Sequence, residues 1–288
     1  MNTLPYIQFK DEVWNHLASL TASRHCETVL RGEWRGVSSN HRHILDVENN
    51  KEDVILKYNV LKSAQDSPFM LSGKLHPYAH HLNSSQIMCY NFFRPQLEND
   101  GIIKDPLTKL LNSIIRKQSK AGKACFEYID SDSNESNGKT NYDLYAEIDD
   151  TRIFFEIKFT ENGFSPCEDN SSHLDKFEKY YKKGMCDSGI FKYDTIIWNR
   201  LFRKHYQLIR NAINVGEKAF VVVITDERNR TTNKQIKDFN DNMLIKTAPY
   251  YSHLIFITWQ ELVELAKKNG FSNDHLNEFT EKYLDTKS

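Results

Sequence analysis

Asp143, Glu156 and Lys158 are the residues of this chain whose types and spacing could do chemistry. They lie within residues 141–164, a stretch that reads as two consecutive strands. Two carboxylates held close together repel each other unless one is protonated or a cation lies between them. A divalent metal ion would relieve that repulsion, because hard cations take carboxylate oxygens as ligands. The three residues therefore indicate a metal site with a lysine beside it.

The strand patterns place these three side chains on one face. From residue 141 to 148 polar and apolar residues alternate, with Tyr142 as the first member of the apolar face, as in a strand with one buried face. From residue 153 to 159 every second residue is apolar, and Glu156 and Lys158 fall on the other face. We expect that shared face to open to solvent.

The loop between the strands decides which residues oppose each other. A two-residue loop at 149–150 puts Asp143 opposite Glu156, whereas a four-residue loop puts it opposite Lys158. Either register keeps the side chains on one face, with opposed Cβ atoms about 5 Å apart, and a three-residue or bulged turn would disturb this. The alternative is an ordinary exposed hairpin with a charged outer face, because short charged motifs often occur by chance.

Composition restricts the class of protein. The chain has 288 residues, 39% of them hydrophobic and 27% charged, which is typical of a globular protein large enough for a substantial core. No apolar run reaches the roughly 20 residues that span a bilayer, and the first residues do not read as a signal peptide, so we expect a cytoplasmic protein without membrane contact. The formal net charge of −1 gives no global argument for binding nucleic acid.

The spacing of cysteines and histidines does not predict a disulfide framework or a second metal site. Five cysteines are widely spaced without a C-x-x-C pair, which favours reduced packing residues over disulfides or zinc. Histidines recur at 41–43 and 76–81, but no cysteine or carboxylate joins them at ligand spacing. We interpret them as packing or hydrogen-bonding residues.

The surrounding pattern predicts helices and strands that position the hairpin. Helices are expected from Asn83, with Gln86 completing a capping box, and from Asp105. Further elements are a strand at 123–129, a polar loop at 130–140, a short helix near 173–183, a long helix at 196–215 ended by Gly216, buried strands at 219–225 and 252–258, and two later helices.

The element order, together with D-x12-E-x-K, resembles the PD-(D/E)XK nuclease superfamily over about residues 100–260. Tyr142 departs from the proline in the name of the motif. The chain is also similar to bacterial type II restriction endonucleases, through segments at 81–93 (H-L-N-S-S-Q-x-x-C-x-N-F-F), 156–161 (E-x-K-F-T-E) and 206–211 (Y-Q-L-x-R-N). The resemblance implies an α/β fold with a restriction-endonuclease-like mixed central sheet flanked by helices. We predict a nuclease domain at 83–288 after an N-terminal extension at 1–82, which could support DNA recognition or packing.

The resemblance also implies roles for individual residues. Asp143 and Glu156 would hold Mg2+, or Mn2+ in its place, with the Ile157 carbonyl as a further ligand. Lys158 would position the attacking water, and Gln207 would contact the phosphate or support the site. The candidates for a third acidic ligand are Glu127 and, with less support, Glu98. Basic residues that could follow the DNA backbone without sequence preference are Arg116, Lys117, Arg200 and Arg203.

The expected activity is Mg2+-dependent hydrolysis of double-stranded DNA by a restriction endonuclease that acts in defence. A homodimer and a companion methyltransferase are expectations from the resemblance alone. The alternatives are a structure-specific repair or mobile-element nuclease, and a non-catalytic nucleic-acid-binding protein on the same fold. Loss of an active-site residue would favour the last of these, and none of the three is lost.

Overall fold

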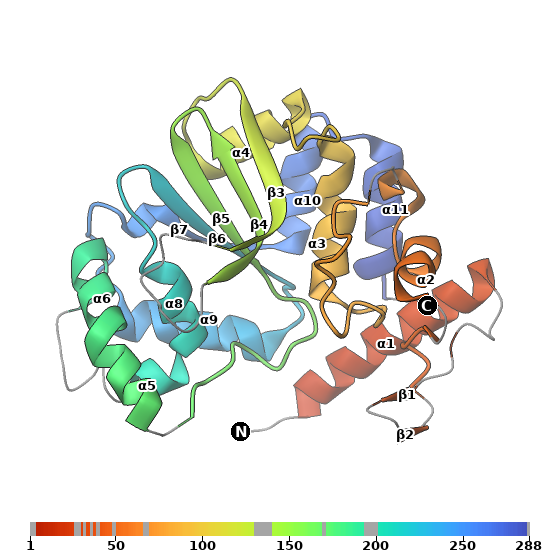
Figure 1. The fold of residues 1–288 in the computed structure, drawn as a ribbon, viewed down its shortest axis with the longest axis horizontal. Helices are drawn as coiled ribbons and strands as arrows, with labels where there is room; N and C mark the ends of the chain where they lie inside the picture. Colours follow the sequence, from red (N-terminus) through yellow and green to blue (C-terminus); the bar gives the residue numbers. More distant parts are fainter. Residues whose placement is uncertain are drawn as a thin grey trace. The chain divides into compact units, whose positions relative to one another are not determined.

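The chain forms two compact units in the computed structural model (Figure 1). The first joins Met1–Ser113 to Gln260–Ser288, and the second is Ile114–Trp259. The structure describes residues 4–25, 30, 33–34, 37–38, 41–47, 50–65, 69–129, 140–168, 171–192 and 201–286. The predicted division at residue 82 follows the change in sequence pattern and stays a prediction.

The second unit is built on a five-stranded mixed sheet with the order β3-β4-β5-β6-β7. Strand β4 runs antiparallel to both β3 and β5, whereas β5, β6 and β7 are mutually parallel. The strands are β3 (Gly122–Ile129), β4 (Asn141–Ile148), β5 (Thr151–Ile157), β6 (Ala219–Thr225) and β7 (Leu254–Thr258). This confirms the predicted α/β class with a mixed sheet.

The hairpin between β4 and β5 turns on two residues. Ile148 pairs with Thr151, and Asp149 adopts a left-handed backbone with φ 51°. Left-handed conformations suit two-residue hairpin turns, and aspartate is among the residues that tolerate them. The two-residue register is therefore confirmed, and the four-residue alternative is wrong.

Helices of the second unit cover one face of this sheet (Figure 1). They are α5 (Ser171–Lys176), the π-helical η4 (Phe177–Tyr181), α6 (Lys182–Ser188), α8 (Tyr206–Ala212) and α9 (Arg230–Met243). Buried side chains of η4, α6, α8 and α9 form one cluster with Phe154 of β5 and with Val221 and Val223 of β6. Every residue of β6 is buried, which explains its continuous apolar run.

The first unit consists mainly of helices. A two-stranded ribbon, β1 (Glu33–Trp34) with β2 (Val37–Ser38), accompanies them. The helices are α1 (Leu4–Arg24), α2 (Lys51–Tyr58), η2 (Lys62–Ala64), α3 (Ser85–Phe93), η3 (Arg94–Gln96), α4 (Asp105–Ile115), α10 (Trp259–Lys268) and α11 (Asn273–Tyr283). In the described ranges, no helix combines the length and apolarity needed to cross a membrane.

Hydrogen bonds of polar side chains connect the early part of this unit to α11. Asn91 of α3 donates to the Tyr283 hydroxyl at 2.6 Å and accepts from the Leu61 amide at 2.9 Å. Glu278 of α11 accepts from the Lys62 amide at 2.8 Å, at the start of η2. The residues before 82 are therefore hydrogen-bonded to segments near both α3 and the C-terminus.

Two predicted helix boundaries are wrong. The cap of α3 is Ser84 rather than Asn83, and Gln86 does not close a capping box, because its side chain bonds the His76 amide and the Lys74 carbonyl instead. Residues 196–200 of the predicted helix at 196–215 lie outside the described residues, and the described part is not continuous. It is interrupted at His205, whose fully buried ring bonds Asp238 at 2.9 Å. The end of α8 lies at Ala212, and Gly216 lacks the left-handed backbone of a cap.

Candidate active site

Asp143, Glu156 and Lys158 gather at one end of the β4–β5 hairpin, as predicted. Their proximity follows from the hairpin register, which pairs Leu144 with Phe155. The next residues, Asp143 on β4 and Glu156 on β5, are therefore close together. Lys158 Nζ lies 2.8 Å from Glu156 Oε1. The structure thus unites two carboxylates and an ammonium group.

The regular alternation of β4 breaks at Asp143. The Tyr142 ring packs on Phe154, 4.7 Å between centroids, and Phe154 shares its face with Glu156. The prediction that Tyr142 belongs to the opposite, apolar face is therefore wrong. On β3, Glu127 occupies the position across from Asp143, between two regular pairs, and has a left-handed backbone with φ 53°. Such interruptions of a strand ladder re-aim side chains, as β-bulges do.

The break turns the Asp143 carboxylate toward β5. Its Oδ2 accepts a hydrogen bond from the Ile157 amide at 2.7 Å. Asp143 is therefore bonded to the backbone N–H of Ile157, the residue predicted to be a metal ligand through its carbonyl. Because the bond reaches across from β4 to β5, it fixes the carboxylate at the edge of the glutamate–lysine pair.

Glu156 is held by amide side chains from α8. Gln207 donates to its Oε1 at 2.7 Å, and Asn211 donates to its Oε2 at 3.1 Å. Gln207 was predicted, but Asn211 was missed as a site residue. Asn211 lies one helical turn after Gln207, so i, i+4 spacing is the signal that could have found it.

The loop after β5 is pinned to α9. Asn229, which caps α9, donates to the carbonyls of Phe159 at 3.0 Å and Glu161 at 2.9 Å. Gln235 accepts from the Phe164 amide at 2.7 Å. Gly163 is required beside it, because its φ is +86° and a Cβ there would lie 2.4 Å from the Gln235 Oε1. This loop therefore has a defined path beside Lys158.

Burial and neighbouring charges shift the pKa values of Asp143 and Lys158. Burial raises the pKa of Asp143 well above its usual range, and the nearby Glu156 and Glu127 carboxylates raise it further. Burial alone would lower the pKa of Lys158, but the carboxylates of Glu156, Glu161 and Asp143 outweigh this and raise it. The lysine is therefore cationic, and Asp143 holds a proton readily unless a cation approaches.

The expectation that the site opens to solvent is wrong for two of the three residues. Glu156 is 4% exposed and Lys158 is 9% exposed, whereas Asp143 is partly buried. The physical reason is that the α8 amides and the loop after β5 surround the glutamate–lysine pair.

The remaining predicted residues are placed as follows. Glu127 is next to the site and accepts from the Asn141 side chain at 2.5 Å, while Glu98 is an exposed residue of the first unit. Arg116 is exposed, and Lys117 bonds Thr151 at 2.6 Å, at the turn end of the hairpin and away from Asp143. Arg203 lies within the helical residues 201–204, and Arg200 lies outside the described residues.

The donor atoms fit a hard divalent cation, although the set is small. Asp143, Glu156 and the Ile157 carbonyl offer oxygen ligands, which Mg2+ prefers. Burial and the Glu156 carboxylate raise the pKa of Asp143, and a cation held between the two carboxylates would relieve their repulsion. Over the described part of the chain, no group of three or more histidine, cysteine or acidic side chains forms a metal cluster.

Comparison with known proteins identifies relatives at the family level. A family model described as "Restriction Endonuclease associating with ARP" matches residues 15–284, which is nearly the whole chain. No curated protein and no solved structure matches the chain. The family match confirms the predicted similarity to restriction endonucleases.

Proposed function

The chain belongs to the family of restriction endonucleases associating with ARP, and we propose that it is a Mg2+-dependent enzyme that hydrolyses phosphodiester bonds of double-stranded DNA. The observation that carries the proposal is the union of Asp143, Glu156 and Lys158 at the end of the hairpin, with Glu156 held by two amides. The strand order and these residues also support assignment to the PD-(D/E)XK superfamily.

Asp143 and Glu156 would hold the metal ion, with the Ile157 carbonyl beside them. When bound, Mg2+ supplies a positive charge that polarises the phosphate and lowers the pKa of coordinated water. Burial and the Glu156 carboxylate raise the pKa of Asp143, and a bound cation would lower it and favour the ionised carboxylate that coordinates a metal.

Lys158 would position the attacking water and stabilise charge on the phosphate. Its raised pKa keeps the ammonium charged, so it acts as a hydrogen-bond donor and not as a base. Gln207 and Asn211 orient Glu156 by donating to both of its oxygens, which leaves the carboxylate little rotational freedom. The result is a preorganised site for in-line hydrolysis.

The biological setting is part of the proposal. We infer a type II restriction endonuclease that acts in defence against foreign DNA in the cytoplasm, with a companion methyltransferase protecting the host. Cutting both strands favours a homodimer. The description of the family names an association with ARP, which makes ARP a further partner to test.

Cleavage of diverse plasmid DNA by the purified chain tests the proposal. We expect cutting with Mg2+, none with EDTA, and at least a hundredfold loss in Lys158→Ala, because the charge at the reacting phosphate is removed. Lys237→Ala is the matched control, since that lysine is exposed on α9 and pairs with Asp241. Cleavage by Lys158→Ala at the control rate, or failure of the unaltered chain to cut any DNA, would refute the assignment.

A further inference from the structure

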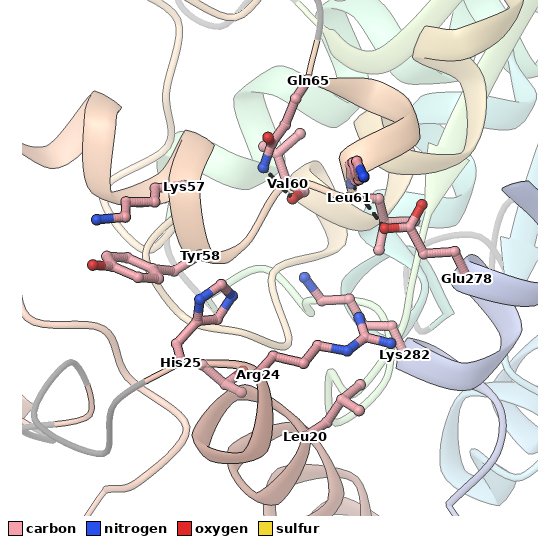
Figure 2. Close-up of a pocket in the computed structure, with 12 residues that line it drawn as sticks. Leu20, Arg24, His25, Lys57, Tyr58, Val60, Leu61, Gln65, Glu278 and Lys282 are labelled. Carbon is pink, nitrogen blue, oxygen red and sulfur yellow. Dashed lines mark hydrogen bonds between the residues drawn. The ribbon is translucent and has the colours of Figure 1, made fainter.

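A pocket in the first unit is lined by basic side chains and has a volume of about 430 Å3 (Figure 2). Segments from α1, α2, the stretch after α2 and α11 contribute to it. None of its residues belongs to the proposed nuclease site. Volumes of this order are typical of pockets that bind small molecules.

Lys282 is the unusual residue of this pocket. Its side chain is 5% exposed, and its ammonium group donates to the Asn59 carbonyl and, at 3.0 Å, to the Asn59 side-chain oxygen. Among the described residues no carboxylate lies within ion-pair distance of it. A buried charge is costly unless an opposite charge compensates it, so this ammonium favours an anion.

Neighbouring charges strengthen that preference. Burial lowers the pKa of Lys282 to about 7, and the positive charge of Arg24 lowers it further, against the raising effect of Glu278. Glu278 is the carboxylate that lines the pocket, and it is already engaged by the Lys62 and Ser63 amides, at 2.8 and 3.2 Å. The pocket therefore presents more positive charge than its carboxylate neutralises.

Arg24 and Lys282 lie close together in the close-up view, with Gln65 and Val60 across from them (Figure 2). Arg24 pairs with Glu281 at 2.6 Å through one nitrogen, and its guanidinium has five N–H donors in all. A guanidinium next to an ammonium is a suitable arrangement for a phosphate group.

The pocket is larger than a phosphate group requires. Water occupies roughly 30 Å3 per molecule in the liquid, so a phosphate group a few times that size would leave most of the space empty. The His25 and Tyr58 rings meet edge to face, 4.9 Å between centroids, and Leu20 and Val60 add apolar surface. Such walls suit a planar heteroaromatic ring.

We propose that this pocket binds a nucleoside monophosphate, with the phosphate at Arg24 and Lys282 and the base against His25 and Tyr58. The ligand would place a compensating negative charge beside the buried ammonium. The proposal does not depend on the nuclease assignment, because it concerns other residues of the chain.

Calorimetric titration of the full chain with adenosine monophosphate, inorganic phosphate and adenosine tests this. We expect one molecule of adenosine monophosphate to bind per chain, and both fragments to bind at least about tenfold more weakly, since each makes part of the contacts. Arg24→Gln should weaken adenosine monophosphate at least tenfold. Lys109→Gln is the matched control, because Lys109 is an exposed lysine outside the pocket that pairs with Asp105.

Lys282→Met is a second variant, with circular dichroism to check that it folds, and Arg24→Gln gives the result alone if it does not. Equal affinity for adenosine and its monophosphate would overturn the proposal, as would unchanged binding by Arg24→Gln or no binding of any probe. Binding of a DNA duplex in place of the mononucleotide, lost in Arg24→Gln, would also overturn it by assigning the pocket to a macromolecule.

Discussion

Two lysines are buried in the part of the chain that the structure describes, Lys158 and Lys282, and they have opposite electrostatic surroundings. Lys158 lies in the second unit among three carboxylates, and its pKa is raised despite burial. Lys282 lies in the first unit with neutral oxygens as hydrogen-bond acceptors, and burial lowers its pKa to about 7. Burial alone therefore does not decide the charge of a lysine, because the neighbours determine the sign of the shift.

The largest effect is expected from removing the charge that holds Lys158. Glu156→Gln should lower the free energy of unfolding by about 3 kcal/mol, since breaking a buried ion pair leaves the partner charge without compensation. Urea denaturation at pH 7 measures this change. Glu178→Gln is the control, because that residue pairs with Lys182 on the surface. An equal cost for both variants would contradict the contrast between buried and exposed pairs.

Stability should depend on pH through Lys282. Its pKa is about 7 in the folded chain and about 10.5 when unfolded, so the unfolded state binds more protons between these values. The free energy of unfolding should therefore rise by roughly 2 kcal/mol from pH 7 to pH 9. Lys158 adds no such slope in this range, because its pKa is raised above its ordinary value.

Denaturation curves of Lys282→Met measure the contribution, since the variant should lose this rise with pH. Lys62→Met serves as the control, because the Lys62 side chain is exposed. A wild-type slope retained in Lys282→Met would show that Lys282 is not the group that titrates.

Asp143→Asn should stabilise the metal-free protein by about 1 kcal/mol at pH 7. The pKa of Asp143 is raised on folding, so its contribution to stability is present below the unfolded pKa and is lost as pH rises through the folded value. Asparagine does not ionise, so the variant does not lose this stability as pH rises. It should also remove any increase in melting temperature caused by Mg2+, which calorimetry would detect. Destabilisation by Asp143→Asn would contradict the assigned repulsion.

The smallest effect is expected at Phe164, whose ring centre lies 5.6 Å from Lys158 Nζ. A double-mutant cycle with Phe164→Leu and Lys158→Met should give a coupling energy of about 0.5 kcal/mol from the cation–π contact. The cycle separates this contact from the packing that the ring provides. A coupling energy of zero would leave the carboxylates as the sole support of the Lys158 charge.

The sequence predicted much of the second unit because its determinants are local. The alternation in β4 and β5, the two-residue turn and the continuous apolar run of β6 are all read along the chain. The same patterns placed Asp143, Glu156 and Lys158 together. The reversal at Tyr142 was not predictable, because it depends on the left-handed Glu127 of a neighbouring strand.

The rest depends on contacts between distant residues. The helix interruption lies at His205, which bonds Asp238 on another helix, and Asn211 contacts Glu156 across 55 residues of the chain. In the first unit, Asn91 bonds Tyr283, a partner near the end of the chain. Sequence periodicity does not predict such pairs, so few features of the first unit could be predicted from the sequence.

The first unit takes its residues from both ends of the chain, whereas the second is continuous. A ribosome therefore makes all of Ile114–Trp259 before it makes α11, which carries Glu278, Lys282 and Tyr283. Until then Asn59, Asn91 and the start of η2 lack their partners. During synthesis the segment with Asp143, Glu156 and Lys158 can fold first, and the N-terminal segments must wait for the last helix.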